Sequence, residues 1–256
     1  MSMLVYPQLG TGALSQYPVR KTRRARTVIN QAPDGTTVRL ADPAGETTEW
    51  QLEYAEISDE EANALEQFFA TAEGTLHGFT FLDPSGNLLS WSDQLDTDSW
   101  QKDPLLVVTP SGIRGWNLAN GGAAGQGIGQ TLQVPGAYTY CFSVHARTET
   151  PATVRLSIGG EVVDRVVSGE WGRSVFAATG PANAESLRFG IEVPAGTAVE
   201  VYGPQVEAQG GAGVYRGSSR GGVYEDAHFR DDVFRITRTG FNRNTCTVNI
   251  IHANHL

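Results

Sequence analysis

Few residues in this sequence have the types and the spacing that catalysis needs. The 256 residues contain no GxSxG, no HExxH, no phosphate-binding loop and no GxGxxG between a strand and a helix. No two Asp or Glu residues stand out as the pair of carboxylates that a glycosidase would place in one cleft. The sequence therefore predicts a protein that is not an enzyme.

Two small groups of side chains have metal-binding chemistry. Asp93, Asp96 and Asp98 form an oxygen-rich cluster of the kind that binds calcium, although no helix-loop-helix context surrounds them. His252 and His255 could chelate a metal, but they have no acidic or cysteine partner nearby, and a frayed C-terminal tail accounts for them. We expect no cofactor, with calcium as the one alternative.

A basic run interrupts a chain that is acidic overall, with 28 acidic and 19 basic residues and a net charge of -9. Three roles are open for it: an edge strand that its charges protect from aggregation, a subunit contact with an acidic surface such as residues 59–61 of a neighbouring copy, or DNA binding. The net charge argues against nucleic acid and anionic lipid as partners. The run consists of Arg20, Lys21, Arg23, Arg24 and Arg26.

Aromatic side chains in the middle of the chain suggest a second binding chemistry. Trp116, Trp171 and Tyr202 accompany many polar residues, and aromatic rings beside polar groups are what sugar-binding sandwiches use to stack on pyranose rings. Burial in the core is the alternative for each of them, because most aromatics in a small sandwich fill its interior. These three residues are the candidate glycan contacts.

The elements that must position these residues are mainly strands. The sequence has 30 glycines, 12 prolines and only two cysteines, and Val, Thr and aromatic residues alternate with turn formers. Cys141 and Cys246 have no metal-ligand spacing, so we expect two buried free thiols. No apolar stretch is long enough for a transmembrane helix, and residues 1–10 lack the pattern of a signal peptide.

The two ends of the chain predict one domain. Residues 27–30, 37–40 and 50–54 read as a β-meander with a turn at residues 42–45, followed by a helix over Ser58–Ala72 that begins with a Ser58/Glu61 capping box. Residues 223–256 hold two alternating runs that are too short to fold alone. Together these ends predict a split β host domain over residues 1–86 and 217–256.

The middle of the chain predicts an inserted domain. From residue 87 onward, short alternating runs such as Tyr138–Ala146 are separated every 8 to 12 residues by Gly or Pro, the spacing typical of a sandwich. A glycine-rich stretch at residues 210–222 resembles a linker. The expected fold is thus mainly β: a split β-barrel or β-sandwich host with one α-helix, and an inserted antiparallel β-sandwich, a jelly roll, over residues 87–216.

Two stretches carry a resemblance to known families. The opening Tyr6-Pro7-Gln8-Leu9, the basic run, the predicted helix and Gly78-Phe79-Thr80-Phe81-Leu82-Asp83-Pro84 resemble minor tail proteins of tailed bacteriophages and prophages, and among them the distal tail (baseplate hub) group. The stretches Asn87-Leu88-Leu89 and Tyr202-Gly203-Pro204-Gln205-Val206-Glu207 resemble a carbohydrate-binding jelly roll of the kind inserted in such tail proteins.

The resemblance implies a structural protein of the virion, made in the bacterial cytoplasm and forming a homo-oligomeric ring at the end of the tail tube. Its partners would be further copies of itself, tail-tube and tail-tip or baseplate proteins, and cell-surface carbohydrate. The alternative is a glycan-binding adhesion module or another tail-associated receptor-binding protein. Neither nucleic acid binding nor membrane insertion is expected.

Overall fold

The computed structural model describes residues 4–253 and has a mainly β architecture with one helix in that range. Cα packing divides the chain into two compact units. The host unit comprises the described residues of Met1–Leu9, Ser15–Phe81 and Tyr224–Leu256, and the insert unit comprises Gly10–Leu14 and Leu82–Val223. The predicted fold class, mainly β with one helix and an antiparallel sandwich, is confirmed.

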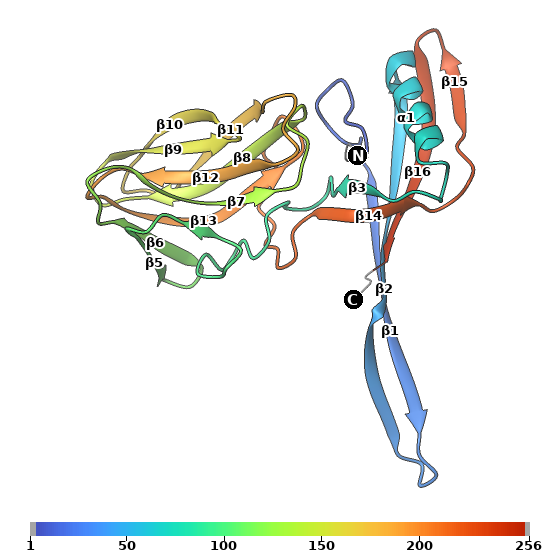
Figure 1. The fold of residues 1–256 in the computed structure, drawn as a ribbon, viewed down its shortest axis with the longest axis horizontal. Coiled ribbons are helices and arrows are strands. Elements are labelled where there is room, and N and C mark those ends of the chain that lie inside the picture. Colours follow the sequence, from blue (N-terminus) through green and yellow to red (C-terminus); the bar gives the residue numbers. More distant parts are fainter. Residues whose placement is uncertain (1–3, 254–256) are drawn as a thin grey trace. The chain divides into compact units, whose positions relative to one another are not determined.

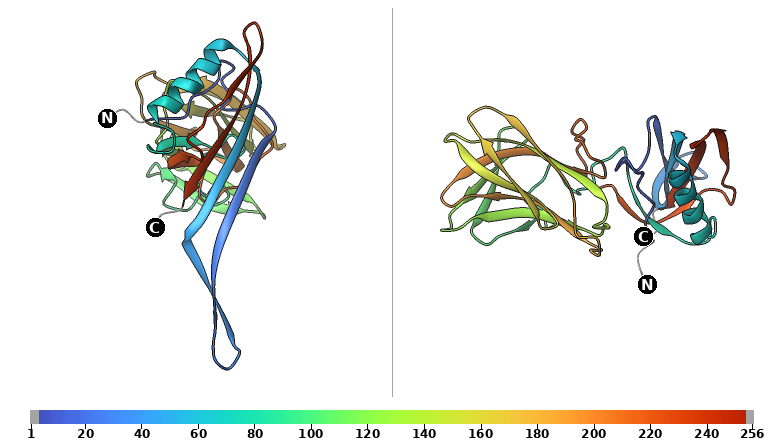
Figure 2. Two further views of the ribbon diagram at one scale, coloured as in Figure 1. Left: turned by 90° about the vertical axis from the view of Figure 1, so that its right-hand side faces the viewer. Right: turned by 90° about the horizontal axis from the view of Figure 1, so that it is seen from above.

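The host unit is built on one six-stranded sheet, drawn in Figures 1 and 2. The C-terminal strand lies against an N-terminal one, since Val248 pairs with Leu52 and Ile250 with Trp50. The order along the sheet is β1 (Val19–Gln31), β2 (Thr37–Ile57), β16 (Arg243–Ala253), β14 (Val223–Phe229) and β3 (Phe79–Leu82), with β15 (Ile236–Gly240) paired to β16.

Strands β1 and β2 extend beyond the rest of the sheet as a two-stranded ribbon, which we define as residues 26–31 paired with residues 37–42. The predicted turn at residues 42–45 is wrong, because this segment lies inside the 21-residue strand β2. The pairing register shifts between Arg24 and Arg26, so residues 43–46 of β2 form a bulge opposite them. Pro43 has no amide to donate, so a bulge tolerates it where a regular ladder would not.

Helix α1 (Asp59–Thr71) begins and packs as its sequence predicts. The Ser58 hydroxyl accepts a hydrogen bond from the Glu61 amide, and the Glu61 carboxylate accepts one from the Ser58 amide, which confirms the capping box. Leu65 and Phe68 are buried on its inner side. The Phe68 ring lies 5.0 Å from Phe79 and 5.8 Å from Phe229, so the helix and two strands share one aromatic core.

The insert unit is an antiparallel sandwich of two five-stranded sheets. Its core lies between them, where the Tyr140 ring is 5.5 Å from Phe189 and Val144, Leu156 and Val201 are fully or almost fully buried. Sheet I has the order β10 (Glu161–Val167), β9 (Ala152–Ile158), β12 (Leu187–Val193), β7 (Gln126–Leu132) and β4 (Gln101–Lys102). Sheet II has the order β11 (Gly172–Thr179), β8 (Thr139–Arg147), β13 (Ala198–Glu207), β6 (Gly115–Asn120) and β5 (Leu106–Ser111).

The glycine-rich stretch at residues 210–222 is packed rather than a free linker, contrary to its prediction. The Gly213 amide donates to the buried Glu207 carboxylate at 2.8 Å, and the Tyr215 hydroxyl donates to Asp93 at 2.7 Å. Cys141 lies on β8 in the insert unit and Cys246 on β16 in the host unit. Both are free and buried, as predicted, and burial raises the pKa of each thiol to about 11. Within residues 4–253, no helix has the length and apolarity to cross a bilayer.

The aromatic core predicts that alanine substitutions of two phenylalanines differ strongly in their effect on stability. Phe68→Ala should lower the free energy of unfolding of the host unit by about 3–5 kcal/mol, because it leaves a cavity among packed rings. Phe241→Ala, at a side chain that is 98% exposed, should change it by less than about 0.5 kcal/mol. Denaturant unfolding followed by circular dichroism measures both, and equal losses would contradict this core.

Candidate functional site

A row of polar side chains crosses the outer face of sheet II. Arg147 on β8 pairs with Glu200 on β13, Glu200 pairs with Asn117 on β6, and Asn117 pairs with Thr109 on β5. Side chains alternate between the two faces of a strand, so these four residues face the same side as one another. Their chain neighbours Ala146, Val199, Val201 and Leu118 are buried on the opposite face.

Arg147 and Glu200 form the charged centre of this row. The Arg147 Nε donates to Glu200 Oε2 at 2.7 Å, and its Nη2 lies 2.6 Å from the same oxygen. The other carboxylate oxygen, Oε1, and the Asn117 side-chain amide have no hydrogen-bond partner among the described residues. The row therefore holds a fixed ion pair beside groups that are able to bond to a ligand.

An aromatic cluster adjoins the ion pair. The Trp171 ring lies 4.8 Å from Tyr202 in an edge-to-face arrangement, and Tyr202 stacks on His145 with ring centroids 4.3 Å apart and planes 7° apart. The Arg147 guanidinium lies 4.8 Å from the centroid of the Trp171 ring. Trp171 remains 38% exposed, so an apolar ring surface is presented to solvent next to polar groups.

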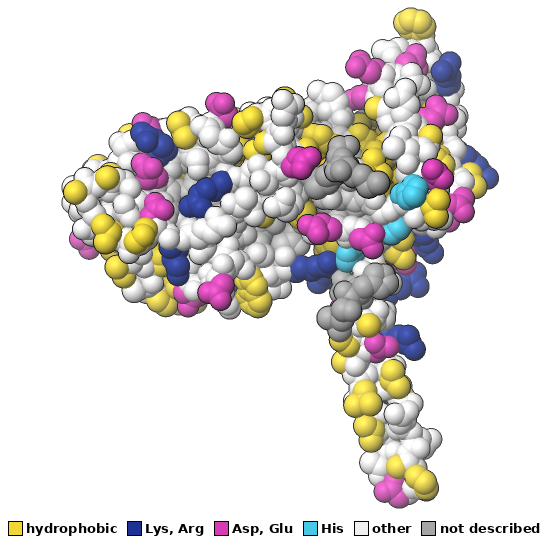
Figure 3. All heavy atoms as spheres, viewed as in Figure 1, with side chains coloured by type: hydrophobic (Ala, Val, Ile, Leu, Met, Phe, Trp, Pro, Cys, Tyr) yellow, Lys and Arg dark blue, Asp and Glu magenta, His cyan; other side chains and the backbone are white. Residues whose placement is uncertain are grey.

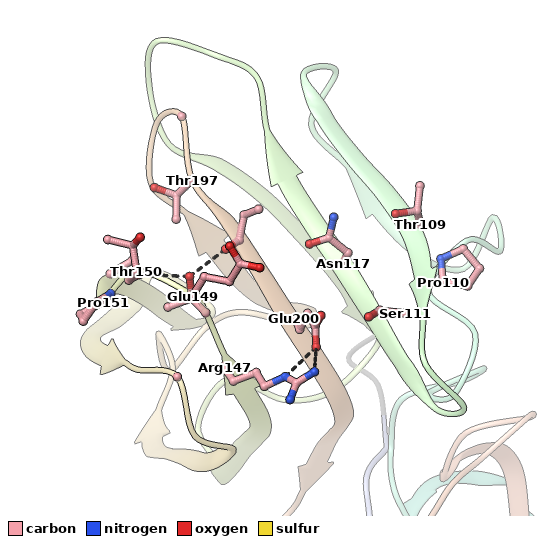
Figure 4. Close-up of a pocket in the computed structure, with 15 residues that line it drawn as sticks. Thr109, Pro110, Ser111, Asn117, Arg147, Glu149, Thr150, Pro151, Thr197 and Glu200 are labelled. Carbon is pink, nitrogen blue, oxygen red and sulfur yellow. Dashed lines mark hydrogen bonds and ion pairs between the residues drawn. The ribbon is translucent and has the colours of Figure 1, made fainter.

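The polar row and the Trp171–Tyr202 pair line an open groove, and Figure 4 shows the part that the polar row lines. One part has a volume of about 920 Å³ and is lined by the polar row together with residues 148–152 and 196–198. The adjacent part, about 420 Å³, is lined by Trp171, Tyr202 and the β5–β6 turn. The two parts share Ser111, Arg147 and Glu200, so the ion pair lies where they meet.

The three predicted glycan contacts have different positions. Trp171 and Tyr202 meet in the groove. Trp116 does not join them: it is 7% exposed on the inner side of β6, and its indole N–H donates to the Asp93 carbonyl at 3.0 Å. The prediction for Trp116 is therefore wrong, because its alternation with Asn117 turns the ring into the core.

The residues predicted from the sequence to contact a glycan did not include Arg147, Glu200 or Asn117. Arg147 and Glu200 are 53 positions apart, and only the pairing of β8 with β13 brings them together. The available signal was alternation, because Glu200 lies between the apolar residues Val199 and Val201 and must face outward in a strand.

The predicted subunit-interface run lies on β1, where most of its charges have partners in the same chain. Arg20 pairs with Glu53 at 3.0 Å and Arg24 with Glu49 at 3.2 Å, and Arg26 pairs with Asp42. The Lys21 ammonium lies 5.4 Å from the Trp50 ring. Arg23 is exposed and has no ion-pair partner among the described residues. Cross-strand pairing thus accounts for most of the run, and its role in a subunit contact stays a prediction.

The candidate metal ligands that lie within residues 4–253 do not converge. Residues 4–253 contain no group of three or more His, Cys, Asp or Glu side chains placed to hold a metal ion. Asp93, in the predicted calcium cluster with Asp96 and Asp98, instead accepts a hydrogen bond from Tyr215. His252 lies in β16 and is buried, so the prediction of a frayed tail is wrong at this residue, and His255 is outside the described residues.

Comparisons with known proteins give distant structural likenesses only. No family model matches the sequence, and no curated protein matches it. Among solved structures, the CBM22-1 xylan-binding domain of Paenibacillus barcinonensis is 13% identical over 51% of this chain and 99% of that one, with a TM-score of 0.40. TmCBM61, solved with β-1,4-galactotriose, is 15% identical over 48% of this chain and 98% of that one, with a TM-score of 0.39.

A bacteriophage protein is also among these likenesses. The enzymatically active domain of tailspike protein 4 of bacteriophage CBA120 is 15% identical, with a TM-score of 0.36, and the match covers 50% of this chain and 22% of that chain. TM-scores and identities this low do not assign a ligand or a family to the chain.

The surroundings of His145 predict its titration. Burial, and then the positive charge of Arg173, lower its pKa below the ordinary value of 6.5. The unfolded chain therefore binds this proton first, and His145 makes the insert unit less stable as the pH falls from 6.5 through the folded-state pKa. Arg173→Gln should raise the His145 pKa in an NMR titration, whereas Arg173→Lys, which keeps the charge, should not. A His145 pKa at or above 6.5 in the unmodified protein would contradict this assignment.

Proposed function

We propose that the insert unit binds a glycan in the groove of sheet II. The observation that carries the proposal is that the exposed Trp171 ring and Tyr202 lie beside the Arg147–Glu200 pair in one open groove. A pyranose ring has an apolar face that stacks on an aromatic ring and a rim of hydroxyls that bond to carboxylate, guanidinium and amide groups. The groove offers both kinds of contact within one row of residues.

The charges in the groove favour a neutral glycan. Arg114 and Arg147 line it together with Glu149 and Glu200, so the positive and negative charges balance. A uronic or sialic acid would meet two carboxylates, one of which already neutralises Arg147. The balanced lining therefore supports binding through hydroxyls rather than through an acidic group.

The proposed activity is binding without hydrolysis. A glycosidase needs one carboxyl group to donate a proton and a second to act as base or nucleophile. Glu200 Oε2 already accepts from the Arg147 guanidinium, so this carboxylate is engaged as a hydrogen-bond acceptor. Glu200 is better suited to accepting hydrogen bonds from sugar hydroxyls.

Substitution of Trp171 tests this proposal. Trp171→Ala should weaken binding to the best neutral polysaccharide about tenfold or more, since losing a stacking surface is expected to cost about 1.4 kcal/mol. Glu200→Gln should weaken it as well, because the amide pairs poorly with Arg147. Affinity electrophoresis in gels containing single polysaccharides, followed by calorimetry, measures both effects.

Trp91→Ala is the matched control, because Trp91 is also in the insert unit, is similarly exposed at 42%, and does not line the groove. Its binding should equal that of the unmodified protein. Equal losses in Trp91→Ala and Trp171→Ala, or no binding to any neutral glycan across a broad array, would contradict the proposal.

A second candidate function is that of a structural virion component, a distal-tail-like ring at the end of a phage tail tube that displays the insert. The observation that favours it is the ribbon of β1 and β2, which exposes Ile29, Val38 and Leu40 at 59%, 46% and 52%. Apolar side chains presented on a two-stranded extension are typical of a surface that becomes covered in an assembly.

This second candidate predicts association with tail tubes. Purified protein mixed with assembled tail-tube protein should appear at one end of the tubes as a ring in negative-stain electron micrographs. Bare tube ends at saturating protein, with glycan binding intact, would reject the tail role and leave the first proposal standing.

A further inference from the structure

The ribbon presents one cross-strand pair that combines an apolar side chain with a free cation. Ile29 on β1 lies directly opposite Arg39 on β2, so both side chains emerge on the same face. Ile29 is 59% exposed. Arg39 is exposed and has no ion-pair partner among the described residues, unlike Arg26, which pairs with Asp42.

The ribbon has no structural support from neighbouring strands. Strand β16 pairs with β2 only from Thr47 to Ile57, so within the described residues the ribbon strands pair only with each other. An isolated two-stranded hairpin is marginally stable in water. In Figure 3 hydrophobic side chains lie along the whole ribbon. Ile29 shares its face with Arg39, whereas Val38 and Leu40 alternate with Arg39 and lie on the opposite face. Covering the exposed Ile29 would stabilise this part of the molecule.

A cavity elsewhere in the host unit has complementary chemistry. It lies between α1 and β15, has a volume of about 300 Å³, and is lined by the apolar side chains of Phe234 and Ile236. Asp59 and Glu66 also line it, against the single cation Arg238, so its lining is net negative. Glu66 is exposed and has no ion-pair partner among the described residues.

The ribbon and the cavity lie at opposite ends of β2. Ile57, at the end of this strand, leads into α1, whereas Leu40 lies in the ribbon. Two views of the host sheet place the helix and the ribbon at its opposite ends (Figures 1 and 2). At about 3.3 Å per residue, the 17 residues between them span roughly 55 Å. The ribbon of one chain therefore cannot enter the cavity of the same chain.

We infer that the ribbon of one copy docks in the α1–β15 cavity of a second copy, with Ile29 against Phe234 and Ile236 and with Arg39 beside Glu66. The first contact uses the ribbon of one copy and the cavity of the other. The first copy therefore keeps a free cavity and the second keeps a free ribbon, so the contact repeats head to tail. Such contacts close into a ring or continue as a filament. This inference deepens the second candidate function, on which it rests for its biological setting, although the contact itself requires no tail protein.

A charge-reversal experiment on the full-length chain tests the contact. The unmodified protein should show, in multi-angle light scattering, a concentration-dependent mass above the 27.5 kDa of one chain. Arg39→Glu and Glu66→Arg should each weaken association about tenfold or more, because each replaces an attraction by a repulsion. Both changes in one chain should restore association, and mixing the two single variants should also restore it.

Lys102→Glu, an exposed cation in the insert unit, is the control and should leave the mass unchanged. Ile29→Asp should weaken association as strongly as Arg39→Glu, through loss of the apolar contact. A monomer at all concentrations, or reversals that are not rescued by their combination, would overturn the inference. So would loss of association in Leu40→Asp with none in Glu66→Arg, which would indicate that two ribbons pair with each other. All of these results are independent of whether the protein binds tail tubes.

Discussion

The pairing register of β8 with β13 is the constraint on which the site depends. Glu200 opposite Arg147 and Tyr202 opposite His145 put charged and aromatic side chains on the outer face of sheet II. The same register puts Val201 and Ala146 in the core. Since side chains alternate with a period of two, a slip of one residue would bury the ion pair and expose the core. Core packing therefore fixes the composition of the groove.

In the host unit, the length of β2 determines how far the ribbon lies from α1. One strand of 21 residues holds α1 at one end and the ribbon at the other, with the shared sheet between them. The apolar surface that the ribbon exposes cannot be covered by the cavity beside the helix in the same chain. Under the two proposals, the free surface of the insert unit binds a glycan and the free surface of the host unit binds a further copy of the chain.

Short sequence patterns correctly predicted the elements that interactions between nearby residues determine. The Ser58/Glu61 capping box located α1, and the alternation of Tyr140, Phe142 and Val144 identified a core strand. The prediction of a turn at residues 42–45 was wrong, because Pro43 and Gly45 lie in a bulge of β2 and the chain does not reverse there. The groove depends on contacts between residues far apart in sequence, and no short motif encodes them.

We propose that the groove, rather than the aromatic core of the insert unit, binds the glycan. Indole N–H signals in NMR spectra, recorded during titration with a panel of neutral oligosaccharides, distinguish these two locations. Trp171 should shift in a saturable manner, while Trp116, whose N–H donates to the Asp93 carbonyl inside the sandwich, should stay unchanged. Shifts at Trp116 with none at Trp171, or no saturable shift with any neutral sugar, would contradict glycan binding in the groove.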